Sequence, residues 1–535
     1  MGGLSTRRFF AFGLAAAGAV PLARRLRFSS ANAVETAVRA VPIAPVEPKR
    51  FRAFGGVRID NYDWLRDPKD PRVVSYLDAE NAYANARLEP IKQLVDELAA
   101  ELKAREAEED ASVPAAYNGY VYQQRFVQGA QYPYIVRRKD APGAPEEIVL
   151  DGSALAAGHP EHCHLGSWTV SPDNSRIAFA LDFTGDRKFR IFVRSIATSE
   201  TLDQSIDNAS SDLVFAADSN TLFYVRNEPT TLRSYQVWLH RLGTYPNSDV
   251  LIYEESDPTF NVSIGLSKSR KIALFNMNEE RTSEFRYLPI DQPSAELKVI
   301  EPRRRGVIYD VDHVGDQFFI RTNLDAPDFR LMSAPQVTTT ALHWKEIVPE
   351  QPGHHLIHFE AFETFVAVDV EDESGTRVRV FNLPDHREIP VPRPVAIGVA
   401  SSSFGDDNEA NLDPAATVLR FHFSNPLVPQ CVYDFDVMTG ALTLRKQDLA
   451  SRWFDRRRYV LDRFSAIAPD GERVPITIVY RKDMRGPAPT LIVGYGAYGL
   501  SLRATFTRSA FSLIDRGFVY AIAHVRGGHE KGERW

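Results

Sequence analysis

Hydrophobic and polar positions alternate with a period of two through most of the chain. From about residue 115 to residue 452, short runs rich in β-branched and aromatic residues are separated by turns of Gly, Asp, Asn and Ser. The cores of the clearest runs begin near Tyr120, Ile177, Leu222, Ile272, Phe318, Phe365 and Val418. Seven similar units of roughly 50 residues are typical of propeller blades, so we predict a seven-bladed β-propeller over residues 115–452. A pair of β-sandwiches fits the same short strands and is the structural alternative.

The pattern before residue 115 has helical spacing instead. Asp70 followed by Pro71 predicts the start of a helix, because aspartate caps the first turn and proline fits the first helical position. A second helix is predicted after Pro90, where apolar residues recur every three or four positions at Ile91, Leu94, Val95, Leu98 and Leu102. Residues 34–114 are therefore predicted to form an N-terminal helical segment.

After residue 452 the apolar runs become nearly continuous, which is typical of strands buried on both faces of a parallel sheet. Strands are predicted at residues 459–468, 474–480, 490–493 and 518–525, with a helix over residues 511–516. This strand, helix, strand order predicts the opening of an α/β domain over residues 453–535.

The first 33 residues have the pattern of an export signal. Arg7 and Arg8 precede an apolar run that ends at Val20 and is too short to cross a bilayer, and Ala31-Asn32-Ala33 resembles a cleavage site. We predict a twin-arginine signal peptide over residues 1–33 and a periplasmic location for the mature protein. A disordered basic N-terminus is the alternative.

Composition and charge narrow the possible partners. The chain is 44% hydrophobic and 25% charged, as expected of a folded globular protein, and 63 basic against 70 acidic residues give a net charge of −7. We therefore predict no nucleic acid partner, and no stable membrane span once the signal is removed. Cys163 and Cys431 are too few for a disulfide scaffold; whether they pair is left open.

Three motifs, taken in order, resemble those of the prolyl oligopeptidase family of serine peptidases. They are NYDWLRD at residues 61–67, GYGAYG at residues 494–499 and LIDRGFVYAIAHVRGG at residues 513–528, and the last is most similar to the oligopeptidase B branch. The resemblance implies a seven-bladed propeller and an α/β-hydrolase domain, with the N-terminal helices on the hydrolase side. It also implies short peptide substrates and no cofactor.

The resemblance assigns one catalytic residue to this sequence. Tyr495 matches the tyrosine whose hydroxyl donates to the oxyanion of the tetrahedral intermediate, and a buried structural tyrosine is the alternative. Tyr498 is expected to be structural.

The catalytic Ser, Asp and His of an α/β-hydrolase are missing from the sequence, because no GxSxG motif occurs in it. We expect the triad beyond Trp535, in a C-terminally truncated or split gene product with a separately encoded C-terminal fragment, and we expect the chain alone to be inactive. The alternatives are a non-catalytic, propeller-containing binding protein and a decayed gene.

The chain departs from the family pattern in two places, at one residue in the first and at two in the second. His529 stands where related peptidases usually have a third glycine, and Arg503 and Thr505 stand where oligopeptidase B tends to carry two aspartates. A preference for paired basic residues is therefore not predicted.

The remaining candidate sites are clusters of histidine and of arginine. For His159, His162, Cys163 and His164 the resemblance implies a loop and not a metal site. His354, His355 and His358 are not predicted as ligands either, because spacing alone does not show converging geometry, so no metal site is predicted. The basic triplets at residues 303–305 and 456–458 are interpreted as solvated surface.

Overall fold

A computed structural model describes residues 40–53, 55–106, 109–159, 161–395, 397–403, 411–448 and 453–535. The predicted signal peptide lies outside the described residues. The chain divides between residues 106 and 107 into two compact units, which are described separately below.

The smaller unit contains a hairpin and two helices. Its elements are β1 (Lys49–Ala53), β2 (Gly56–Asp60), η1 (Asp63–Arg66), α1 (Pro71–Leu88), η2 (Glu89–Ile91) and α2 (Lys92–Ala104). The predicted cap of the first helix is confirmed, because the Asp70 side chain accepts a hydrogen bond from the backbone N–H of Arg72. None of the residues of α2 is buried, and Leu94 and Val95 are about half exposed.

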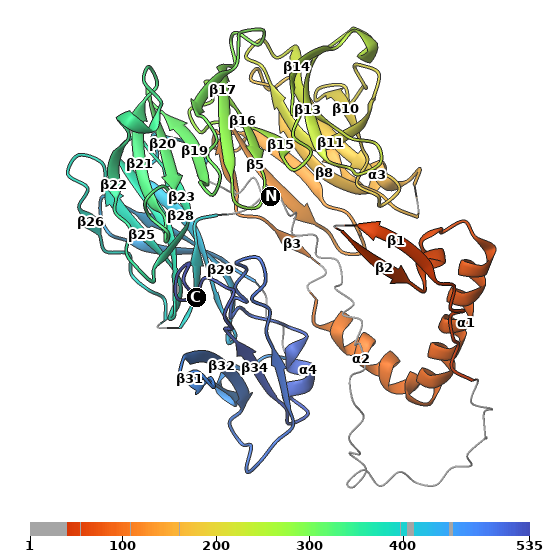
Figure 1. Cartoon of the computed structure of the whole chain (residues 1–535). Helices are drawn as coiled ribbons and strands as arrows, with labels where there is room; N and C mark the ends of the chain where they lie inside the picture. Colours follow the sequence, from red (N-terminus) through yellow and green to blue (C-terminus); the bar gives the residue numbers. More distant parts are fainter. Residues whose placement is uncertain are drawn as a thin grey trace. The chain divides into compact units, whose positions relative to one another are not determined.

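The larger unit begins with antiparallel sheets whose strands pair largely in sequence order (Figure 1). The first two sheets contain β3 (Asp110–Ala111), β4 (Ala115–Tyr117), β5 (Tyr120–Phe126), β6 (Tyr134–Lys139) and β7 (Glu146–Asp151), then β8 (His164–Val170), β9 (Arg176–Asp182), β10 (Phe189–Ser195), β11 (Ile206–Phe215), β12 (Thr221–Asn227), β13 (Ser234–Arg241) and β14 (Val250–Glu254). Strand β11 pairs with β10 near Ile206 and with β12 from Leu213 onward, so it joins two four-stranded groups.

The following sheets repeat this pattern. They contain β15 (Asn261–Leu266), β16 (Ile272–Asn278), β17 (Ser283–Pro289) and β18 (Lys298–Glu301); β19 (Tyr309–Val314), β20 (Gln317–Thr322), β21 (Arg330–Pro335) and β22 (Lys345–Val348); and β23 (His355–Ala361), β24 (Phe365–Asp372), β25 (Gly375–Asn382), β26 (Glu388–Ile389), β27 (Gly398–Ser401), β28 (Val418–Asn425), β29 (Val428–Asp436) and β30 (Leu442–Gln447). Short helices α3 (Gly152–Ala156), η3 (Pro246–Ser248) and η4 (Ala341–His343) connect some of the strands. All seven predicted strand cores lie in strands, namely β5, β9, β12, β16, β20, β24 and β28.

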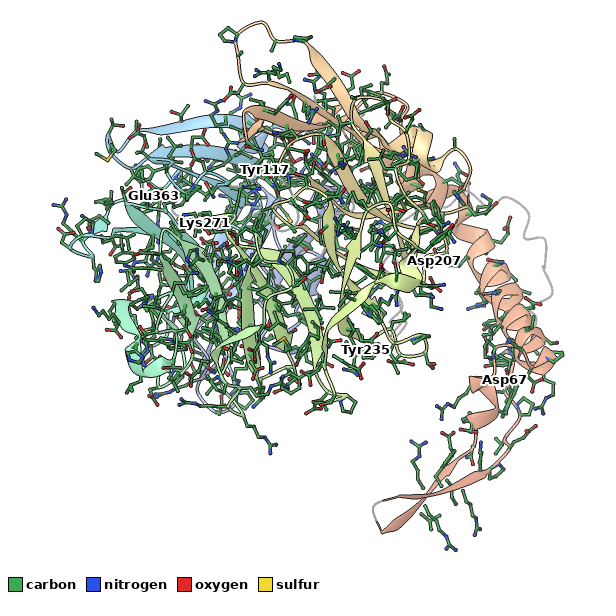
Figure 2. All side chains as sticks on the ribbon, turned by 90° about the horizontal axis from the view of Figure 1, so that it is seen from above. Asp67, Tyr117, Asp207, Tyr235, Lys271 and Glu363 are labelled. Carbon is green, nitrogen blue, oxygen red and sulfur yellow. The ribbon has the colours of Figure 1, made fainter. Side chains whose placement is uncertain are left out.

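Neighbouring groups of strands pack face to face through apolar cores, and the series closes on itself. Each core combines residues of two successive groups, as in the cluster that joins β12 to β16 through Phe223 and Phe275. The last group returns to the first, since Val432 packs on Val113 and Lys446 lies 3.0 Å from Asp110. Figure 2 shows this unit from above, with side chains filling the space between Tyr235 on β13 and Glu363 after β23. A closed ring of antiparallel sheets is a β-propeller.

A separate sheet follows the propeller, in the order β31 (Tyr459–Ile467), β32 (Arg473–Arg481), β34 (Val519–Ala523) and β33 (Thr490–Val493). Strands β33 and β34 are parallel, and α4 (Ala510–Ile514) lies between them in the sequence; η5 (Arg456–Arg458) precedes the sheet. The predicted strands and helix are thus present. Burial of β33 is incomplete, since Ile492 is 62% exposed and no described element covers it.

Candidate functional site

The two glycine-rich motifs meet at one edge of the second sheet. Because β33 and β34 are parallel, their carboxyl ends lie at the same edge, where open α/β sheets bind ligands. The loops that follow touch through their backbones, since a Cβ atom on Gly527 would collide with the carbonyl oxygen of Gly496. Both glycines have positive φ, +73° at Gly496 and +93° at Gly527, a conformation that favours glycine. The motifs therefore build one compact corner.

Tyr495 extends from this corner toward solvent. It lies two residues after the end of β33 and is 53% exposed, so its side chain is accessible to a ligand at the sheet edge. Tyr498, which we expected to be structural, is 79% exposed and has a φ of +57°.

A buried polar network lies next to this corner. His524 Nε2 lies 2.9 Å from the Thr477 hydroxyl, and His524 Nδ1 lies 3.4 Å from Glu530 Oε1. Burial raises the pKa of Glu371. The charge of Arg503 acts to lower this pKa, whereas the charge of Glu530 raises it further. Arg503, one of the two departures from the oligopeptidase B pattern, thus lies in the electrostatic surroundings of two buried carboxyl groups.

His529, the other departure, needs no left-handed backbone, since it is not among the residues with positive φ. Its backbone N–H donates to the Ser501 hydroxyl at 3.0 Å, and its ring packs against Gly499, where a Cβ atom would collide with it. The ring also stacks on His355 at a centroid distance of 3.9 Å.

The histidines and cysteines that the sequence offers as candidates have different surroundings in the structure. His159 stacks on Phe183, while the His162 ring lies 3.8 Å from Asp182. Cys163 and Cys431 are both buried, and no disulfide joins them. In the described part of the chain, His355, His529 and Glu533 form the one group of at least three His, Cys, Asp or Glu whose ligand atoms all lie within 4.8 Å of one another.

One of the basic triplets is not simply solvated surface. Arg303 pairs with Glu255 at 2.6 Å and with Glu284 at 3.4 Å, and its guanidinium stacks on Phe260. Burial by itself would raise the pKa of Glu255, but the pairing with Arg303 lowers it. The prediction is therefore wrong for Arg303, whereas Arg457 in the second triplet is 90% exposed in its side chain.

The chain is a β-propeller protein that carries a second sheet with a parallel strand pair. Comparison with known proteins gives its family. Residues 42–448 match the family described as "Prolyl oligopeptidase, N-terminal beta-propeller domain". The chain is 36% identical over 502 residues to "Dipeptidyl aminopeptidase BI" of Pseudoxanthomonas mexicana, covering 90% of this chain and 68% of that protein. It is 27% identical to "Protease 2" of Moraxella lacunata, covering 92% of this chain and 71% of that protein. The chain belongs to the prolyl oligopeptidase family, as its motifs predict.

Solved structures agree with this assignment. Oligopeptidase B from Leishmania major superposes with a TM-score of 0.85 at 28% identity, over 93% of this chain and 73% of that one. Oligopeptidase B from Trypanosoma brucei with covalently bound antipain gives a TM-score of 0.84, with the same identity and coverage. The β-propeller prediction is therefore confirmed over the β-sandwich alternative. None of the described helices is long and apolar enough to span a membrane.

Proposed function

We propose that this chain supplies the propeller and part of the catalytic domain of a serine-type oligopeptidase that hydrolyses short peptides, similar to oligopeptidase B. The observation that carries the proposal is the corner formed by Gly496 and Gly527, which presents Tyr495 at the carboxyl edge of a parallel strand pair. The peptidases that the chain resembles support the substrate class.

Tyr495 is proposed to stabilise the oxyanion of acyl transfer. A phenol has an ordinary pKa near 10 and is a neutral hydrogen-bond donor at pH 7, as this role requires. In the proposed reaction, a serine attacks the peptide carbonyl, a histidine takes and returns the proton, and an aspartate orients that histidine. The sequence contains no GxSxG, so we place this triad outside the 535 residues and propose that the chain alone is inactive.

The domain boundaries and the blade count belong to the same proposal. We assign residues 34–114 to the helical segment, 115–452 to seven blades, and 453–535 to the first part of an α/β-hydrolase domain. Seven successive groups of strands, each centred on one of the predicted strand cores, support the count. A non-catalytic, propeller-containing binding protein is the second candidate, favoured by the absence of GxSxG from this sequence.

To test this proposal, the chain is combined with the C-terminal part of the Pseudoxanthomonas relative. The rate of hydrolysis of arylamide peptides, including dipeptidyl arylamides, is then measured. We expect Tyr495→Phe to lower kcat by about 10²- to 10³-fold, the usual cost of one oxyanion donor. Tyr498→Phe is the matched control, since this exposed tyrosine lies in the same loop. Equal rates for the two variants would contradict the role of Tyr495.

A further inference from the structure

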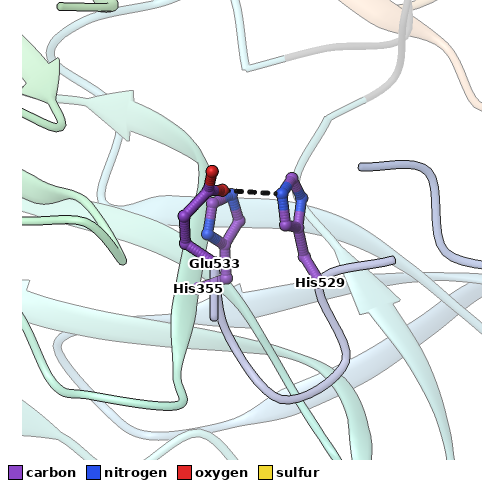
Figure 3. Close-up of side chains that lie close together, drawn as sticks. All are labelled: His355, His529 and Glu533. Atoms are coloured by element: carbon purple, nitrogen blue, oxygen red, sulfur yellow. Dashed lines mark ion pairs between the residues drawn. The ribbon is translucent and has the colours of Figure 1, made fainter. Parts of the chain in front are cut away.

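A histidine of the propeller and two residues of the last segment of the chain meet in one cluster (Figure 3). His355 begins β23, whereas His529 and Glu533 follow β34. His529 Nε2 lies 2.9 Å from Glu533 Oε2, and the two imidazole rings stack with an interplanar angle of 18°. Two imidazoles and one carboxylate therefore lie close together where the propeller meets the last segment of the chain, with their ligand atoms within 4.8 Å of one another.

His355 is buried against two other rings. It is 3% exposed, stacks on His529, and meets the ring of Phe329 in a T-shaped contact at a centroid distance of 5.1 Å. Its Nδ1 atom is buried without a hydrogen-bond partner and lies 3.8 Å from Asp328 Oδ1. In metal-binding histidines a carboxylate commonly accepts a hydrogen bond from one ring nitrogen and leaves the other nitrogen free to coordinate. Asp328 lies beside Nδ1 without making that hydrogen bond here, and metal binding would require His355 to move closer to it.

Asp328 also fixes the segment that carries Glu533. Its carboxylate accepts hydrogen bonds from the backbone N–H of Glu533 at 2.6 Å and of Gly353 at 2.7 Å. The same side chain thus lies beside His355 and fixes the backbone at Glu533, so it can support the ligands from outside the metal's own coordination shell.

We propose that His355, His529 and Glu533 bind a divalent transition metal ion of the zinc class, which links the propeller to the second sheet. Two nitrogen ligands and one carboxylate suit Zn²⁺, whereas Ca²⁺ and Mg²⁺ prefer oxygen ligands alone. The three ligand atoms lie within 4.8 Å of one another. Metal–ligand bonds of about 2.0–2.2 Å require them to lie closer together than this limit. The two stacked rings are nearly parallel, and a metal bond lies in the ring plane, so the ion requires the His529 ring to rotate out of the stack. His529 and Glu533, whose side chains are 23% and 51% exposed, have the room to turn toward the ion, and a fourth position is left for water.

The metal would act at the junction and not in catalysis. His355 lies on a propeller strand and the other two ligands lie beyond the sheet that carries Tyr495, so the ion would stabilise the contact between the two parts of this unit. His529 stands where the resemblance implies a glycine, so the site would be a property of this chain.

The test uses the untagged 535-residue chain, freed of metal by a chelator and titrated with Zn²⁺ in a calorimeter. We expect one tight site per chain, an increase in Tm on zinc addition, and a visible Co²⁺ spectrum of the intensity typical of four-coordinate cobalt. His529→Gly and Glu533→Gln should each weaken zinc binding by at least about tenfold and abolish the Tm increase. Both positions are partly exposed and His529→Gly restores the family residue, so the variants should keep the fold, which circular dichroism checks.

Two further variants serve as controls. His343→Gln changes an exposed histidine outside the cluster, and His162→Gln changes the histidine-rich loop; both should bind zinc like the unaltered chain. Loss of binding in His162→Gln with retention in His529→Gly would place the metal elsewhere and overturn the proposal. The absence of any zinc-dependent Tm increase in the unaltered chain would also overturn it.

Discussion

The carboxylate of Asp328, before β21, accepts a hydrogen bond of 2.6 Å from the backbone N–H of Glu533. A buried side chain of the propeller therefore fixes the backbone of the segment that follows the second sheet. This contact makes the propeller and the second sheet depend on each other for stability.

Asp328→Asn should destabilise the chain. The amide would turn an N–H group toward a backbone donor at Glu533 or Gly353, so we expect the free energy of unfolding to fall by about 1–3 kcal/mol. Urea unfolding followed by tryptophan fluorescence measures the change. Asp325→Asn, an exposed position in the same loop, is the control and should change little. Equal stability of the two variants would show that the Asp328 contact adds nothing to the free energy of unfolding.

His240 should make stability depend on pH. Its ring, 1% exposed, lies 2.7 Å from Asp249 and 3.1 Å from Asp203. Burial alone would lower the pKa of His240, but the two carboxylates raise it above its ordinary value. The contribution of the charged pair is thus complete below the unfolded pKa of about 6.5 and is lost as pH rises through the folded pKa.

The measurement for His240 is urea unfolding across this pH range. His240→Gln should lose about 3 kcal/mol at pH 6, because two buried carboxylates lose their charged partner, and the loss should shrink at alkaline pH. His343→Gln, on an exposed turn, provides the baseline. A loss for His240→Gln that is the same at every pH would rule out a charged imidazole.

Gly527→Ala should cost more stability than Gly517→Ala. Both glycines have positive φ, but the Cβ atom would meet the Gly496 carbonyl at one position and open space at the other. Backbone strain alone costs about 1–2 kcal/mol, so Gly517→Ala measures that part and the excess in Gly527→Ala measures the close approach of the two loops. Thermal unfolding of the two variants gives the comparison. An equal loss would mean that the loops separate at no cost.

Export is a further prediction, which rests on Arg7, Arg8 and the cleavage site at Ala33. The precursor should be cut after Ala33, leaving Val34 as the first residue of periplasmic material. N-terminal sequencing checks this, and Arg7→Lys combined with Arg8→Lys should retain the precursor in the cytoplasm. Cytoplasmic protein that keeps Met1 in the unaltered chain would contradict the prediction.

Local features of the sequence predict much of the fold. The seven strand cores and the Asp70 cap depend on side-chain alternation and on one short-range hydrogen bond, so a single sequence reveals them. Local features do not predict whether β33 is buried, because an apolar strand has the same sequence pattern whether or not another element covers it.

The candidate sites depend on long-range contacts and were harder to predict. Arg303 looks like a surface residue in the sequence because its partners Glu255 and Glu284 come from distant turns and strands. The sequence does not predict His355 as a ligand, because the spacing of His354, His355 and His358 alone does not show converging geometry. Its neighbours in space, His529 and Glu533, are brought to it only by the fold. The departure of His529 from the family glycine was the one available signal.

The most direct test of the central proposal is fluorophosphonate labelling of the 535-residue chain, alone and after complementation with the C-terminal part of a relative. Fluorophosphonates react with the activated serine of a triad. We predict no labelled serine in the chain alone, and one labelled serine, in the added part, after complementation. Labelling of a serine within the 535 residues of the chain alone would contradict the proposal that the nucleophile lies outside this sequence.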